Sequence, residues 1–200
     1  MDEGQRFFLI RVVFLAAAWL AVFAVEGVLG AGKEIIFAED KIAMTLPLGW
    51  YESELNAGDV EAGFATQDNR SSIFFRSFDG GNGTMQDLMD LTIANFDADE
   101  RFYLKEVDDY KTGQVGGIKD GKEKKWSAIY SQAEGVVRKN DFEYEMRFYL
   151  LVFDVGDRVY YVQASTTLPV QTGRENEIME MIRSITVSYT HLTLPTKQPV

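Results

Sequence analysis

The chain has 200 residues, of which 46% are hydrophobic and 13% aromatic, and 31 acidic against 20 basic side chains give it a net charge of −11. This length and apolar fraction suit one domain with a substantial core. So acidic a chain repels phosphate backbones and anionic lipid, and nucleic-acid binding is therefore not expected. The absence of cysteine excludes disulfides, thiol chemistry and lipid attachment through an N-terminal cysteine.

The N-terminal segment contains an uncharged apolar run of fourteen residues, Val12 to Val25. A membrane-spanning helix needs about 20 apolar residues, whereas about 7 to 15 are typical of a secretory signal. Residues 1–31 are therefore predicted to be a cleaved signal peptide, with cleavage after Gly30 or Ala31. A retained N-terminal membrane anchor and a buried core helix are the alternatives. The protein is predicted to be exported, either periplasmic or membrane-anchored and facing the periplasm.

The C-terminal end resembles the translation of a sequencing adapter over Val187 to Thr196. Residues 187–200 are therefore predicted to be a non-native tail, and a genuine C-terminal strand is the alternative. The only histidine, His191, lies in this tail. We expect deletion of residues 187–200 to leave thermal stability unchanged, and the single domain is predicted to span residues 32–186.

Short strands open the domain. Ile35–Ala38 and Lys41–Leu46 predict a hairpin that Pro47 ends, because proline cannot donate to a strand ladder. Trp50 follows in a tight turn. Its ring is interpreted as a cap on the core, with a ligand platform as the alternative.

A second strand pair is predicted at residues 61–67 and 71–78. The loop that follows, Asp79–Gly83, does not match a calcium loop, because glycines stand at its third and fifth positions where oxygen ligands are required. No Gly-Lys-Ser/Thr follows to make a phosphate loop. The loop is therefore predicted to be a flexible link.

A helix is predicted next. Thr84 and Asp87 match a capping box, and apolar residues recur at helical spacing as far as Phe96. The carboxylates of Asp97–Glu100 are interpreted as a solvated turn rather than a metal site, because neither a histidine nor a second cluster accompanies them.

Residues 102–111 and 124–133 predict two further strands, and the connection between them contains the turn signals Gly116-Gly117 and Asp120-Gly121. Lys119–Lys125 is the main concentration of basic residues, with a net charge of +2. It is interpreted as a rim that blocks edge pairing, and an anionic-ligand site is the alternative.

The strongest pattern covers residues 142–166. Apolar and charged residues alternate from Phe142 to Phe148, and Tyr149–Phe153 is apolar throughout. After a short turn, Arg158–Ala164 is apolar in both phases. This pattern predicts a hairpin at the centre of a sheet that is covered on both faces.

A closing helix is predicted from a second capping-box pattern, Thr172 with Glu175, and an apolar stripe that ends at Ile185. The predicted order is four strands, a helix, four strands and a helix. This order indicates an α+β fold, in which a central antiparallel sheet of about six to eight strands is covered by helices on both faces as an α/β/α sandwich.

Four stretches carry a resemblance: Ile42–Trp50, Gly121–Trp126, Val159–Val162 and Ile182–Ile185. Together with the N-terminal segment they resemble the PsbP/DcrB-like family of small exported α/β/α domains, which have the Mog/PsbP-type fold. The resemblance implies a central antiparallel sheet with helices on both faces. It also implies mostly non-catalytic roles at membranes, from extrinsic photosystem II subunits to bacterial envelope proteins.

The predicted function is that of a non-enzymatic envelope module that binds a protein or membrane-associated partner. Without cysteine or a native histidine, the usual nucleophilic mechanisms lack their residues. An apolar small-ligand carrier is the alternative, followed by a hydrolase built on paired carboxylates or a Ser-Lys dyad.

No catalytic residue, cofactor or metal site is assigned from the sequence. Functional residues are expected at strand ends and loops, near Trp50, Asp79–Gly83 or Lys119–Lys125. A buried carboxylate pair would favour the hydrolase, a large dry cavity the carrier, and an exposed aromatic patch the binding module.

Overall fold

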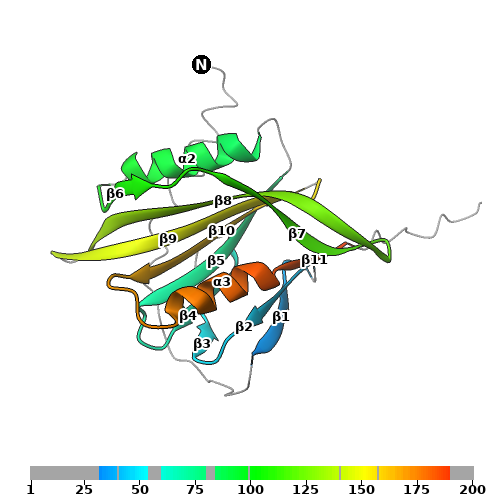
Figure 1. Cartoon of the computed structure of the whole chain (residues 1–200), viewed down its shortest axis with the longest axis horizontal. Coiled ribbons are helices and arrows are strands. Elements are labelled where there is room, and N and C mark those ends of the chain that lie inside the picture. Colours follow the sequence, from blue (N-terminus) through cyan, green and yellow to red (C-terminus); the bar gives the residue numbers. More distant parts are fainter. Residues whose placement is uncertain are drawn as a thin grey trace, which may run out of the picture.

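The computed structural model describes residues 32–39, 41–53, 60–79, 84–98, 100–139, 141–156 and 158–189. The predicted signal segment, residues 80–83 of the predicted flexible link and the tail from Thr190, including His191, lie outside the described residues. Within them the chain forms one sheet and two helices (Figure 1).

Strands make up most of the described fold, and the helices are short. The helices are α2 (Met85–Ala98) and α3 (Arg174–Ser184). The strands are β1 (Lys33–Phe37), β2 (Ile42–Leu46), β3 (Trp50–Glu52), β4 (Val60–Thr66), β5 (Ser71–Asp79), β6 (Phe102–Val107), β7 (Lys111–Lys119), β8 (Lys122–Lys139), β9 (Phe142–Asp154), β10 (Arg158–Thr167) and β11 (Thr186–Tyr189).

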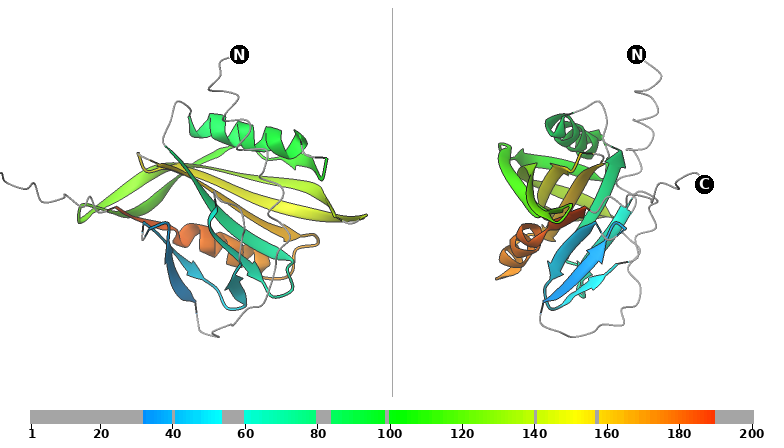
Figure 2. Two further views of the ribbon diagram at one scale, coloured as in Figure 1. Left: turned by 180° about the vertical axis from the view of Figure 1, so that it is seen from behind. Right: turned by 90° about the vertical axis from the view of Figure 1, so that its right-hand side faces the viewer.

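The eleven strands form one sheet in the order β1-β2-β11-β7-β8-β9-β10-β5-β4-β3, and β6 pairs with a further part of β8. Among the described strands, β11 and β7 are parallel neighbours, whereas the other pairs are antiparallel. The sheet curls strongly, so that its outer strands bend toward the side of α3 (Figure 2).

The predicted central hairpin is confirmed as β9 and β10. Its side chains point alternately into two cores, because successive residues of a strand face opposite sides of the sheet. Phe148, Leu150 and Val152 face the core that contains α2. Tyr149, Leu151 and Phe153 face the core that contains α3. Both faces of this hairpin are therefore covered.

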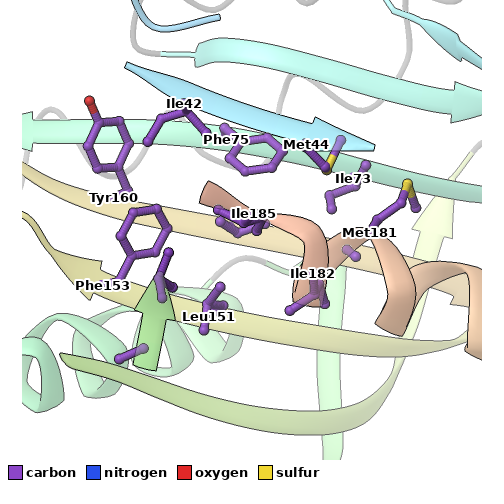
Figure 3. Close-up of a cluster of buried hydrophobic side chains, with 14 of the residues drawn as sticks. Ile42, Met44, Ile73, Phe75, Leu151, Phe153, Tyr160, Met181, Ile182 and Ile185 are labelled. Carbon is purple, nitrogen blue, oxygen red and sulfur yellow. The ribbon is translucent and has the colours of Figure 1, made fainter. Parts of the chain in front are cut away.

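The concave side of the sheet is filled by α3 and by side chains from most of the strands. Ile178, Met181, Ile182 and Ile185 contribute the helical part of this core, and Figure 3 shows several of its members packed together. The two ends of the curled sheet meet on this side. The ring of Phe37 on β1 lies 6.2 Å from that of Phe64 on β4 and 4.6 Å from that of Phe75 on β5.

The predicted fold class, an α/β/α sandwich with six to eight strands, is wrong. The sheet has eleven strands and curls into a half-barrel, while the two helices have only 14 and 11 residues. Much of the concave core comes from the outer strands of the curled sheet itself. Residue patterns report which face of a strand is apolar, but they do not report how far a sheet bends.

Strand β7 was predicted only as a connection, because of its glycines. The structure explains one of them. A Cβ atom on Gly117 would lie 1.9 Å from the backbone oxygen of Val187 on β11. Glycine therefore allows β11 to approach β7 closely.

The two helices begin differently. For α2 the predicted capping box is confirmed: the Asp87 amide donates to Thr84 Oγ1 at 3.1 Å, and the Thr84 amide donates to Asp87 Oδ2 at 2.7 Å. For α3 the predicted box of Thr172 and Glu175 is wrong. Its N-cap is Gly173, whose φ of 83° suits glycine, and no side chain caps it. Within the described chain, neither helix is long and apolar enough to cross a membrane.

The C-terminal strand conflicts with the expectation that residues 187–200 are dispensable. Val187 is 1% exposed and belongs to the concave core. Its strand lies between β2 and β7. That the tail is non-native stays a prediction, but three of its residues complete the sheet.

A pair of truncations tests this role of β11. Deleting residues 187–200 should lower the free energy of unfolding by roughly 2 kcal/mol, the value of one buried valine side chain. Deleting residues 190–200 should change it by less than about 0.5 kcal/mol. Urea titration followed by circular dichroism measures both, and equal stability of the two truncated chains would contradict the packing of Val187.

The close approach of β11 can be tested at Gly117. Gly117→Ala should lower the free energy of unfolding by about 1–3 kcal/mol, because the new methyl group overlaps the backbone of β11. Gly113→Ala is the matched control on the same strand, since a Cβ there meets no atom within 4 Å. We expect the control to be neutral or stabilising by up to about 1 kcal/mol. A similar loss at both positions would assign the effect to β7 itself.

Candidate functional site

Trp50 is a structural residue. Its side chain is 4% exposed, and its Nε1 donates to Glu177 Oε2 on α3 at 3.0 Å. The same carboxylate oxygen accepts a hydrogen bond from Arg174 Nη1 at 2.6 Å, and the Arg174 guanidinium lies 5.4 Å from the centre of the indole ring. Trp50 therefore fixes β3 against α3, as the interpretation of a core cap predicts, and does not offer a platform to a ligand.

A polar cluster lies between the concave face of the sheet and α3. Arg147 donates to Glu134 Oε1 from Nε at 3.0 Å, and its Nη1 lies 3.6 Å from Glu175 Oε2. Two tyrosines are close by, and burial raises the pKa of Tyr130 and of Tyr149 to about 12. Phenols with such pKa values keep their protons near neutral pH. The cluster therefore has the character of a structural ion-pair network.

The described carboxylates do not build a metal site. Within the described parts of the chain, no group of three histidine, aspartate or glutamate side chains converges. In the loop Asp79–Gly83, Asp79 ends β5, and the other four residues lie outside the described range.

Lys119–Lys125 forms the end of the β7–β8 hairpin. Asp120 and Gly121 have positive φ values of 51° and 74°, the conformation of a tight two-residue turn. Lys122, Lys124 and Lys125 are exposed. Lys124 Nζ lies 5.6 Å from the centre of the Trp126 ring, which is buried in the concave core.

Three aromatic side chains are exposed at the opposite end of β8. Tyr103 on β6 is 59% exposed, Phe142 on β9 is 65% exposed and Tyr144 on β9 is 43% exposed. We call these three residues the aromatic end. In the register, Tyr103 lies opposite Val136, and Tyr144 lies opposite Val137. Phe142 and Tyr144 therefore share one face of the sheet, and Tyr103 lies on the other.

The aromatic end stands on a packed base. Phe102, the neighbour of Tyr103, is buried with its ring 5.3 Å from that of Phe96 on α2. Phe96 in turn lies 5.1 Å from Phe148 on β9. Figure 1 shows the β8–β9 hairpin extending past the ends of both helices. The exposed rings thus lie on β6 and β9 next to this packed base or beyond it.

Charges around the aromatic end neutralise one another. Arg138 Nε donates to Glu143 Oε1 at 2.9 Å, and Lys105 forms an ion pair with Glu145. The hydrogen bond from Lys105 to Glu145 raises the pKa of the lysine. Each of these two ion pairs is neutral, so neither adds a net charge beside the exposed aromatic rings.

Sequence reasoning missed the aromatic end. The alternation from Phe142 to Phe148 correctly indicated a strand, but it placed every aromatic residue of that phase in the core. The hairpin in fact extends beyond the core, so the first residues of β9 are exposed in both phases. The one available signal was the position of Phe142 beside the polar turn residues Lys139 to Asp141.

No family model matches the chain, and no curated protein matches it. A structure of a protein from Bacteroides thetaiotaomicron is 15% identical over 80% of this chain, with a TM-score of 0.47. This chain spans 49% of that protein, about half of its length.

Two other solved structures match more of their own length. Cyanobacterial PsbP (CyanoP) from Synechocystis is 13% identical over 84% of this chain and 99% of that chain, with a TM-score of 0.52. LpqN from Mycobacterium tuberculosis is 14% identical over 78% of this chain and 90% of that chain, with a TM-score of 0.51. At such identities the likeness concerns the fold alone. The curled sheet with its two helices is a PsbP-type fold, as the resemblance in the sequence predicted.

Proposed function

We propose that the protein is a non-enzymatic domain of the cell envelope that binds a protein or membrane-associated partner through its aromatic end. The observation that carries this proposal is the exposure of Tyr103, Phe142 and Tyr144 on β6 and β9, at the same end of β8. Single exposed apolar residues are common on protein surfaces, but three large aromatic side chains together are typical of contact sites.

The energetics of association support the aromatic end as a contact. Aromatic side chains bury a large area for little loss of conformational entropy, and tyrosine is enriched among the residues that dominate binding. The packed base of Phe96, Phe102 and Phe148 fixes the strands β6 and β9, which carry the rings, before a partner arrives. A preorganised contact loses less entropy on binding.

The placement of the rings also indicates the shape of the partner. Phe142 and Tyr144 lie on one face of the hairpin, and Tyr103 lies on the other. A flat partner would cover only one of these faces. A partner with a cleft that receives the end of the hairpin would cover both.

The other candidate functions have less support. The concave side of the sheet, where a carrier of this fold would hold its ligand, is occupied by α3 and packed side chains (Figure 3). A carboxylate-based hydrolase needs two acids with separate roles. Glu134 and Glu175 each interact with Arg147 instead.

Export and the domain limits belong to the same proposal. Residues 1–31 have the composition of a secretory signal or anchor. LpqN, which shares the fold, is described as involved in cell envelope biogenesis. We infer that this chain is exported as one domain over residues 32–186, and that residues 187–200 are a non-native tail.

Site-specific photocrosslinking in the native host tests the aromatic end. Benzoylphenylalanine at Phe142 should give a discrete adduct with another protein, which mass spectrometry identifies. Benzoylphenylalanine at Leu48, an exposed residue outside the aromatic end, is the matched control and should not give this adduct.

A variant then ties the adduct to the neighbouring rings. Tyr103→Ser with Tyr144→Ser should abolish the adduct at position 142 and change the free energy of unfolding by less than about 1 kcal/mol, because both side chains are exposed. An adduct that contains only a second copy of this chain, or one that forms equally from position 48, would overturn the proposal.

A further inference from the structure

The other end of β8 carries positive charge that the protein itself does not neutralise. Within the described part of the chain, Lys122, Lys124 and Lys125 form no ion pair. Other basic residues are paired although carboxylates are in excess: Lys105 with Glu145, Arg138 with Glu143, Arg147 with Glu134, Arg158 with Glu61 and Arg174 with Glu177. Lys122, Lys124 and Lys125 are therefore available to an external anion.

The charge of this end differs in sign from that of the rest of the chain. Lys119–Lys125 contains four lysines and two acids, a net charge of +2. The whole chain has a net charge of −11, so the remainder carries −13. Figure 1 shows the β7–β8 hairpin extending from the sheet on the side away from the aromatic end.

The register places three lysines on one face of the hairpin. Lys119 lies directly opposite Lys122, and Lys124 follows two residues later on the same face. Glu123 and Lys125 lie on the other face. Like charges directly opposite each other destabilise a strand pair.

One edge of β8 is open beside these lysines. Strand β7 pairs with β8 over Lys122–Tyr130. On the other side, β9 begins to pair with β8 only at Ala128. Among the described strands, none lies beside Lys122–Ser127 on that side. Alternate residues of an antiparallel strand direct their N–H and C=O groups to each side, so this edge offers free backbone donors and acceptors.

We propose that this edge binds an extended acidic polypeptide segment, which adds to β8 as a further strand and sets alternate carboxylates against Lys122 and Lys124. Residues two apart on an extended strand are about 6.6 Å apart, so a carboxylate at every second residue of the segment can match one lysine each. Backbone hydrogen bonds supply part of the affinity, and the lysines favour segments that carry carboxylates at alternate positions. This inference is independent of the aromatic end.

The charge distribution favours a narrow chain over a broad anionic surface. A bilayer or a duplex would also face the body of the protein, whose −13 charge would repel it within a screening length of about 8 Å. An extended peptide can contact the hairpin without also facing the acidic body of the protein. Lysines on an open edge also discourage neutral strands from pairing with it. An acidic strand can pair there because its carboxylates neutralise the lysines.

A binding assay on the full chain tests the proposal. The probe is a fluorescein-labelled octapeptide of alternating glutamate and threonine, and the readout is fluorescence anisotropy. The affinity should fall as the salt concentration rises. Lys122→Gln with Lys124→Gln should weaken binding roughly tenfold. The control, Lys33→Gln with Lys111→Gln, removes the same charge from two exposed positions elsewhere and should keep the affinity within about twofold.

Two further probes separate strand addition from general attraction. Octapeptides with N-methyl groups on their odd or even residues keep their charge, and at least one should lose binding because it cannot complete the ladder. Retention of the unmethylated peptide's affinity by both methylated peptides would overturn strand addition. If the two double lysine variants lost affinity for the octapeptide equally, and circular dichroism showed that both are folded, the assignment to this edge would be overturned. Tighter binding to phosphatidylglycerol vesicles than to the peptide would assign the lysines to a lipid surface instead.

Discussion

The burial of β9 and β10 on both faces is the constraint on which the rest of the structure depends. From Phe148 to Phe153 every side chain is less than 9% exposed, so each face of this hairpin needs its own cover. On one face α2 supplies that cover. On the other, α3 is too short to cover a sheet of eleven strands, and the sheet curls so that its outer strands close around the same core.

Local patterns predicted the elements that depend on neighbours in the chain. The apolar run of Tyr149–Phe153 indicated the central hairpin, and the stripe from Thr84 to Phe96 indicated α2. The curled sheet, by contrast, depends on residues that are distant in the sequence. Gly117 was predicted to lie in a turn, and its role in admitting β11 becomes visible only when Val187 is placed beside it.

One of the two candidate sites could be identified from a local sequence pattern, and the other could not. The lysines of Lys119–Lys125 were identified from composition, whereas the aromatic end was not. Its exposure follows from length: β8 has 18 residues and, at about 3.3 Å per residue, is about 59 Å long. Helix α2 has 14 residues and is about 21 Å long. So short a helix leaves the far part of such a strand uncovered, and no local pattern states against which part of the strand the helix will lie.

The position of β11 also determines when the sheet can be completed. Among the described strands, β1 and β2 join the ladder through β11, which is the last of these strands along the chain. β1 and β2 are synthesised first, and their backbone pairing is complete only when β11 is present. Pairings between such distant segments form slowly, and a chain that is still being synthesised has no β11 to offer. Such an order keeps the chain from completing this sheet before its last described strand is present.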